Sequence, residues 1–196
     1  MKAACRTLYD RPYDFEEDAV TDAPYDAAAE FDRQVQRLVE LGYPKLAGTA
    51  EDDFRDLVAP LRAAAVTGTA GLPAPTAARV PFLLVVTRDL IPVEERLPLT
   101  TLTGKRKPGF LDRHYADGDL ARFDPIKELE VPAGPAYLLF DVDRGEETLN
   151  LPPSSAMESI TGQGRLPLTI DEGIAFVTLH PAALEKNKCF SLVGFT

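Results

Sequence analysis

The sequence contains few of the residues that carry nucleophilic, redox or metal chemistry. Among its 196 residues there is no tryptophan, and there are only two cysteines and two histidines. Cys5 and Cys189 make neither a disulfide framework nor a metal cluster, so we predict no metal site and no cofactor. Cys189 lies in an apolar stretch, and we therefore expect a small buried side chain there rather than a reactive thiol.

Long apolar segments are also missing. No run approaches the roughly 18 residues that a membrane-spanning helix needs, and the first residues lack the apolar core of a signal peptide. We therefore expect a cytoplasmic protein with no membrane partner. The glycines of residues 67–76 fit neither of the common phosphate-loop patterns. With 45% hydrophobic and 27% charged residues, the chain is typical of a globular protein with one core.

A net positive charge occurs in only one segment of the sequence. The formal net charge is −10, and an acidic protein is a poor candidate for a nucleic-acid partner, because phosphate neutralisation dominates that affinity. Residues 96–122 are the exception, with six arginines and lysines against three aspartates. The small scale of this basic segment suits a small anion better than a duplex.

The pattern of apolar residues predicts an α+β fold. Residues 26–61 read as an N-terminal helical hairpin, in which Gly42 ends the first helix and Thr49 caps the second. A mixed sheet of about four strands follows. Two further helices are expected, one over Pro153 to Thr161 and one from Ile170. The expected strands are Val80 to Thr87, Leu97 to Thr103, Ala136 to Val142 and Cys189 to Phe195.

The chain divides into two parts by composition. Residues 1–25 are acidic but also carry tyrosines and phenylalanines, so they form either a loose N-terminal tail or a segment that wraps along the body. Residues 26–196 read as a single α+β domain. Nothing in the sequence indicates an oligomeric state.

Two pairs of acids invite a catalytic interpretation. Asp171 and Glu172 are neighbours on a helix and point about 100° apart, so we interpret them as first-turn acids that complement the helix dipole. Thr169 and Glu172 form the spacing of a capping box. Asp141-x-Asp143 resembles the nucleophile motif of haloacid-dehalogenase phosphatases and the start of a calcium loop. The residues that follow fit neither, which favours a hairpin turn with solvated acids.

The best candidate site is the basic segment. Lys105, Arg106 and Arg113 can clamp an anion, and His114, flanked by Arg113 and Tyr115, can move a proton near neutral pH. The alternative is that this turn is only solvated. His180 precedes Pro181 near a helix break and is interpreted as structural.

Two functional hypotheses remain. The first is a binding or accessory module for a small anionic ligand or a protein partner. The second is a metal-independent enzyme on a small anionic substrate, with His114 as the acid/base and Lys105, Arg106 and Arg113 as charge clamps. The first is favoured, because the motifs supply no nucleophile–base pair. A cleft around His114 would favour the enzyme, and a convex surface the module.

Several segments together resemble a family of unknown function found mainly in high-GC bacteria. They include Ala136-Tyr-Leu-Leu-Phe-Asp-Val-Asp-Arg-Gly-Glu-Glu, Leu168-Thr-Ile-Asp-Glu-Gly-Ile-Ala and Glu185-Lys-Asn-Lys-Cys-Phe. The resemblance covers most of residues 30–194 and implies no activity, substrate or catalytic residue. It does imply a C-terminal tail with tryptophan, cysteine and histidine beyond the last strand. The sequence, which ends at Thr196, lacks this tail.

Overall fold

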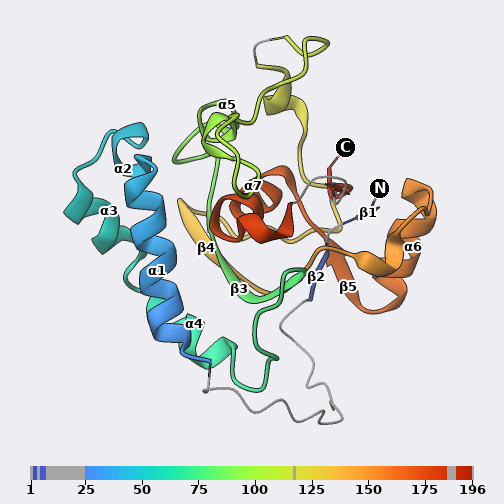
Figure 1. The fold of residues 1–196 in the computed structure, drawn as a ribbon, viewed down its shortest axis with the longest axis horizontal. Helices are drawn as coiled ribbons and strands as arrows, with labels where there is room; N and C mark the ends of the chain where they lie inside the picture. The colour runs from blue at the N-terminus through green and yellow to red at the C-terminus, as the bar shows by residue number, and fades with distance from the viewer. Residues whose placement is uncertain (1, 4, 8–24, 117, 185–188, 196) are drawn as a thin grey trace.

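The computed structural model describes residues 2–3, 5–7, 25–116, 118–184 and 189–195 (Figure 1). The helices are α1 (Ala27–Glu40), α2 (Tyr43–Leu46), α3 (Glu51–Val58), α4 (Leu61–Gly68), α5 (Val93–Arg96), α6 (Pro153–Gly162) and α7 (Ile170–Leu179). The strands are β1 (Lys2–Ala3), β2 (Cys5–Thr7), β3 (Arg79–Val86), β4 (Ala136–Asp143), β5 (Arg165–Pro167) and β6 (Phe190–Ser191). Short 3-10 helices are η1 (Leu97–Leu99), η2 (Asp119–Arg122), η3 (Glu146–Thr148) and η4 (Pro181–Ala183). Helices and a small sheet together make an α+β fold.

The main sheet has the strand order β3-β4-β2-β5, and its neighbouring strands pair antiparallel. The β3–β4 pair is the longest, with a register from Arg79 opposite Asp143 to Val86 opposite Ala136. A parallel pair of two-residue strands, β1 and β6, forms a second sheet that does not share a strand with the first. The expectation of one mixed sheet is therefore corrected to an antiparallel sheet and a separate parallel pair.

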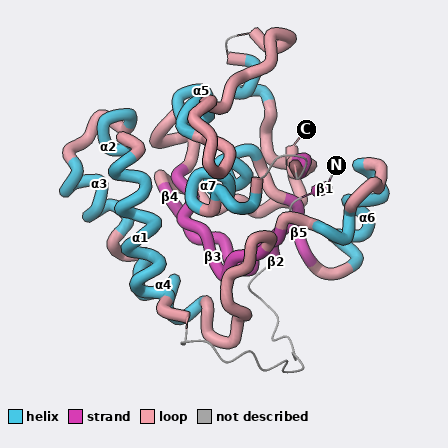
Figure 2. Tube along the Cα trace, viewed as in Figure 1, coloured by secondary structure: helices cyan, strands magenta, loops and turns pink. Residues whose placement is uncertain are grey.

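The core is built around β3. All residues from Val80 to Val86, Pro81 included, are buried. A strand buried along its whole length is covered on both faces. Helices α1 and α7 contact β3, and α4 contacts β4. Figure 1 shows α1 to α4 grouped on one side of the sheet, with α7 in front of it. Figure 2 shows the long loops that run between these elements.

Helix α1 forms where the apolar spacing predicts it. Asp26 caps it by accepting hydrogen bonds from the amides of Ala28 and Ala29, and Phe31, Val35 and Leu38 are buried on one face. The expected second helix is divided into α3 and α4, and Pro60 occupies the N-cap position of α4. The prediction that Thr49 caps it is wrong. Ala50 occupies the N-cap position without a side-chain hydrogen bond, and the Thr49 hydroxyl lies 3.4 Å from the carbonyl oxygen of Pro44.

The prediction of a strand over Leu97 to Thr103 is also wrong. This segment continues α5 as the 3-10 helix η1, and only Thr101 forms an isolated bridge, to Pro108. Two features explain the difference. Arg96 is buried and donates to the carbonyl oxygen of Val86, which fixes α5 against the sheet. Pro98 has no amide hydrogen to give to a strand ladder.

The C-terminal segment is less regular than its apolar character suggests. Only Phe190–Ser191 is a strand, and Cys189 is exposed, so the expectation of a buried cysteine is wrong. The predicted capping box of the preceding helix, α7, is confirmed: the Thr169 hydroxyl accepts from the Glu172 amide, and the Glu172 carboxylate accepts from the Thr169 amide.

The N-terminal segment 1–25 contributes two strands to the structure. Cys5–Thr7 (β2) lies between β4 and β5 in the main sheet, and Lys2–Ala3 (β1) pairs with β6. Residues 8–24 lie outside the described residues.

Candidate functional site

Part of the basic segment, residues 100–109, forms a loop that starts at the end of η1 and closes on itself. The amide of Gly109 donates to the carbonyl oxygen of Thr100 at 2.8 Å, and the amide of Lys105 donates to that of Leu102 at 2.9 Å. Thr103 anchors the loop to the body, because its hydroxyl donates to the carbonyl oxygen of Pro181 at 2.9 Å. The loop is therefore held at its base, at its turn and against the segment that follows α7.

A cavity of about 710 Å³, called the loop cavity below, lies against this loop. Its walls are mainly apolar and come from two parts of the chain: residues 97–110, which supply Leu97, Leu102, Pro108 and Phe110, and the segment after η4, which supplies Leu184. Ligand pockets commonly have volumes of about 300–1,000 Å³. The cavity is thus large enough for a ligand with an extended body.

Three cationic side chains stand at the same cavity. Lys105, Arg106 and Lys107 line it and are all exposed. Within the described ranges, none of the three forms an ion pair with an acidic side chain. The Lys107 ammonium lies 4.9 Å from the centre of the Phe110 ring, a distance suited to a cation–π contact. These cations are available to a negatively charged ligand.

Arg113 and His114 are placed differently. Both are exposed, and neither lines this cavity. The His114 side chain is 78% exposed, and its Nδ1 contacts Asp112, whose carboxylate also accepts from the His114 amide at 3.0 Å. Figure 1 shows the segment around residues 111–122 projecting from the top of the molecule. The structure therefore brings Lys105 and Arg106 to one cavity and leaves the other two candidates outside it.

The Asp-x-Asp pair at the end of β4 has structural partners. The buried Asp141 accepts hydrogen bonds from Arg79 and Arg165, and the second arginine also donates to the Asp141 carbonyl oxygen at 2.8 Å. Asp141 has a φ of 53°, in the left-handed region that aspartate tolerates better than most residues. Asp143 accepts from the amide of Gly145 at 2.6 Å. Asp141 is thus a buried ion-pair partner and not the solvated acid that the sequence suggested.

Asp171 is likewise more than a first-turn acid. It is buried and accepts hydrogen bonds from Arg88, at 2.8 Å, and from the fully buried Arg96. Its neighbour Glu172, also buried, accepts from the hydroxyl of Tyr137 at 2.9 Å. Sequence reasoning missed both arginines, because no local pattern connects residues 88 and 96 to a helix that begins at residue 170.

His180 lines a second cavity, of about 330 Å³. Its wall also includes Tyr25, Glu30 and Arg33. The Nε2 atom of His180 lies 2.7 Å from the carbonyl oxygen of Thr76, and the ring stacks on Phe176. Burial lowers the pKa of His180, which favours the neutral ring. These contacts support the structural interpretation of this histidine.

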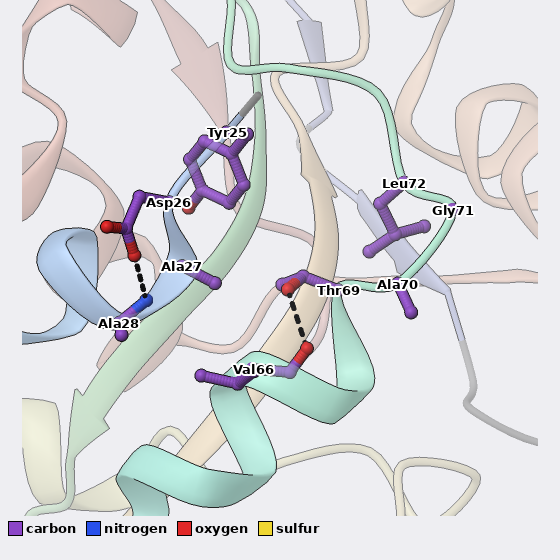
Figure 3. Close-up of a pocket in the computed structure, with 9 residues that line it drawn as sticks. All are labelled: Tyr25, Asp26, Ala27, Ala28, Val66, Thr69, Ala70, Gly71 and Leu72. Carbon is purple, nitrogen blue, oxygen red and sulfur yellow. Dashed lines mark hydrogen bonds between the residues drawn. The ribbon is translucent and has the colours of Figure 1, made fainter. Parts of the chain in front are cut away.

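A third cavity, of about 570 Å³, lies between the start of α1 and the end of α4 (Figure 3). Asp26 is engaged there in capping α1, and the Thr69 hydroxyl donates to the carbonyl oxygens of Ala65 and Val66. Burial raises the pKa of Tyr25, which keeps its phenol neutral. Compared with the loop cavity, this one presents no cationic side chain among its described lining residues.

Among the described residues, no group of three or more histidine, cysteine, aspartate or glutamate side chains is positioned to hold a metal ion. No described helix combines the length and apolar character needed to cross a membrane.

Comparison with known proteins places the chain in a family. The model of a family of unknown function, DUF5701, matches residues 37–196. The chain belongs to this family. No curated protein and no solved structure matches it. The DUF5701 match spans the loop cavity and the helix α7, so both features lie within the part of the chain that defines its family.

Proposed function

We propose that this DUF5701 protein binds a small anionic ligand at the cavity beside Lys105, Arg106 and Lys107. The observation that carries the proposal is the cluster of three exposed cations, without ion-pair partners in the described part of the chain, at the wall of a cavity. On a protein with a net charge of −10, such a cluster makes a local positive potential that favours capture of a small anion.

The position of His114 supports binding over catalysis. A general acid must lie within hydrogen-bond reach of the group that it protonates. The cations that would hold the substrate line the cavity, whereas His114 is exposed and lies outside that wall. Binding is therefore the favoured function, and the enzyme with His114 as the acid/base is the alternative.

The test is a titration of inorganic phosphate into isotope-labelled protein, followed by the amide chemical shifts of residues 102–109. We expect weak saturable binding, and about tenfold weaker binding in Lys105→Ala/Arg106→Ala, which corresponds to about 1.4 kcal/mol. The matched control is Lys45→Ala/Lys127→Ala, which also removes two exposed positive charges but away from the cavity.

The comparison of the two double variants decides the proposal. Equal affinity in both would show that only the overall charge matters, and the proposal would be wrong. A separate Arg113→Ala variant tests the projecting segment. If this variant alone abolished binding, the site would lie on residues 111–122 and not at the cavity.

A further inference from the structure

The wall of the loop cavity indicates which class of anion it takes. We infer that the ligand is a monomeric amphiphilic anion, with one carboxylate or phosphate head and an unbranched apolar body. This inference rests on the proposed function, since it assigns the head group to Lys105, Arg106 and Lys107. It adds a role for the apolar wall, which a simple inorganic anion does not use.

The first argument is the character of the wall. Five of the residues that line the cavity are apolar, four from residues 97–110 and the fifth, Leu184, from the segment after η4. Phe110 is 66% exposed and lies in the same wall as Leu97, Leu102, Pro108 and Leu184, so its ring belongs to a contiguous apolar surface open to water. An apolar body lying on this wall would remove the ring from water and gain the hydrophobic free energy of that burial.

The second argument is that two neutral polar groups of the wall, the Thr100 hydroxyl and the Gly109 amide, already have partners within the protein. The hydroxyl of Thr100 donates to the carbonyl oxygen of Leu97 at 2.7 Å, and the amide of Gly109 donates to that of Thr100. A sugar or a nucleotide base buried here would leave its own hydrogen-bonding groups without partners, which costs free energy. A hydrocarbon chain has no such groups and incurs no such cost.

The third argument is the arrangement of charge and apolar surface. Lys107 stands over the ring of Phe110, so a cation and the most exposed part of the apolar wall are neighbours. A head group held by the cations therefore places the first atoms of an attached chain beside Phe110. Amphiphilic anions have this same sequence of charge followed by hydrocarbon.

A free molecule is favoured over a membrane surface as the source of this chemistry. The binding groups line an open hollow of about 710 Å³, a volume in the range of sites for single small molecules. In addition, the net charge of −10 is repelled by an anionic membrane surface. The ligand that these features describe enters the cavity from solution.

The experiment compares straight-chain carboxylates of increasing length, from acetate to decanoate, below their micelle concentrations, by calorimetry or by chemical shifts. We expect the affinity to rise about fourfold for each added methylene until the cavity is filled, because each buried methylene contributes a fixed transfer free energy. The neutral alcohol 1-octanol should bind at least about tenfold more weakly than octanoate, because it lacks the charge.

Two apolar substitutions test the wall. Phe110→Ala should lower the affinity for octanoate at least about tenfold while leaving the affinity for acetate or phosphate unchanged. Leu149→Ala is the matched control, since Leu149 is a 49% exposed apolar side chain that does not line this cavity. Both positions are exposed, so neither substitution should prevent folding.

The outcomes separate this inference from the proposed function. If acetate and decanoate bind equally well and both lose affinity in Lys105→Ala/Arg106→Ala, the anion site stands and the amphiphilic ligand is wrong. If no anion binds at all, the proposed function is wrong and the inference is wrong with it. If the protein sediments with vesicles of anionic lipid but binds no monomeric carboxylate, the surface is a membrane contact and the inference is overturned.

Discussion

At the scale of single residues, the buried carboxylate of Asp171 connects three elements. It belongs to the first turn of α7 and accepts hydrogen bonds from Arg88 and from Arg96 of α5. Arg96 is almost completely buried, and it also donates to the carbonyl oxygen of Val86 in β3. A charge so far from water depends on its counter-ion, because an unpaired buried charge is strongly destabilising.

We expect Asp171→Asn to lower the free energy of unfolding by about 3–5 kcal/mol, because it leaves Arg96 without its negative partner. The measurement is urea-induced unfolding of the wild type and the variant. The control is Asp32→Asn, which removes an exposed carboxylate paired with Arg62 and should cost less than about 1 kcal/mol. Similar losses in the two variants would mean that the buried pair adds nothing beyond a surface pair.

The capping box makes a second, smaller residue-scale prediction. Thr169→Ala removes the oxygen that accepts from the Glu172 amide, and we expect a loss of about 1 kcal/mol in the free energy of unfolding. Thr169→Ser keeps the hydroxyl and should retain most of the stability. The same urea titration measures both. A serine variant as unstable as the alanine variant would assign the loss to the missing methyl group in this buried position.

At the scale of elements, the loop of the proposed site depends on Gly109. A Cβ atom at this position would collide with the Thr100 side chain and with the backbone carbonyl oxygen of Leu97. Because one of the two obstacles is backbone, the loop must shift to make room. The close approach that Gly109 allows is what closes the loop onto η1.

We therefore expect Gly109→Ala to weaken binding of phosphate or octanoate at least about tenfold and to destabilise the fold by about 1–3 kcal/mol, the usual cost of overpacking. Gly162→Ala is the control, since a Cβ there meets no atom within 4 Å. That variant should bind normally and keep or slightly increase its stability, because alanine is a better helix former than glycine. Normal binding by Gly109→Ala would show that the closed loop is not needed for the site.

Sequence reasoning identified the elements whose signals are local. Strand β3 contains the apolar run Val80 to Val86, β4 begins with the apolar run Ala136 to Phe140, and the capping box of α7 lies within four consecutive residues. By contrast, β5 is three residues long and is a strand only because β2 pairs with it. The prediction of a strand from Leu97 is wrong because the contact that fixes this segment, from the Arg96 side chain to the carbonyl oxygen of Val86, is tertiary and leaves no periodic pattern in the sequence. Pairing partners decide such elements, and a single sequence does not show them.

At the scale of the whole molecule, the candidate site was also only half visible in the sequence. Lys105 and Arg106 are adjacent and stand out on an acidic chain, so their grouping could be predicted. The apolar wall could not, since Leu97 and Leu184 meet only in the folded protein. The sequence suggests His114 as a member of the site because it is near the cations along the chain. In the fold its side chain is exposed, contacts Asp112 and does not line the cavity.

The pH dependence of stability is a property of the whole molecule, and His180 contributes to it. Burial holds the pKa of His180 below its value in the unfolded chain, about 6.5, although the contact with the Thr76 carbonyl oxygen and the nearby Glu30 act in the opposite direction. As the pH falls below about 6.5, the unfolded chain therefore binds a proton before the folded one does, and folding stability decreases until the pH passes the folded pKa.

We expect His180→Gln to reduce this loss, because glutamine does not titrate and its side-chain amide can still donate to the Thr76 carbonyl oxygen. The measurement is the free energy of unfolding at about pH 7.5 and about pH 5.5, a range that brackets the unfolded pKa of histidine. The wild type should lose more stability over this range than the variant. An equal loss in both proteins would assign the pH dependence to other groups.

The place of β2 in the sheet has a consequence for how the protein comes to be folded. Cys5–Thr7 is synthesised long before its two neighbours in the sheet, β4 and β5, which begin only at Ala136 and Arg165. Until β4 has emerged from the ribosome, both β2 and β3 lack the neighbour that joins them, and until β5 has emerged one edge of β2 stays unpaired. Unpaired edges of apolar strands are sites of aggregation, and pairings between distant segments form slowly. During synthesis, β2 therefore stays without its sheet partners until β4 and β5 have been made.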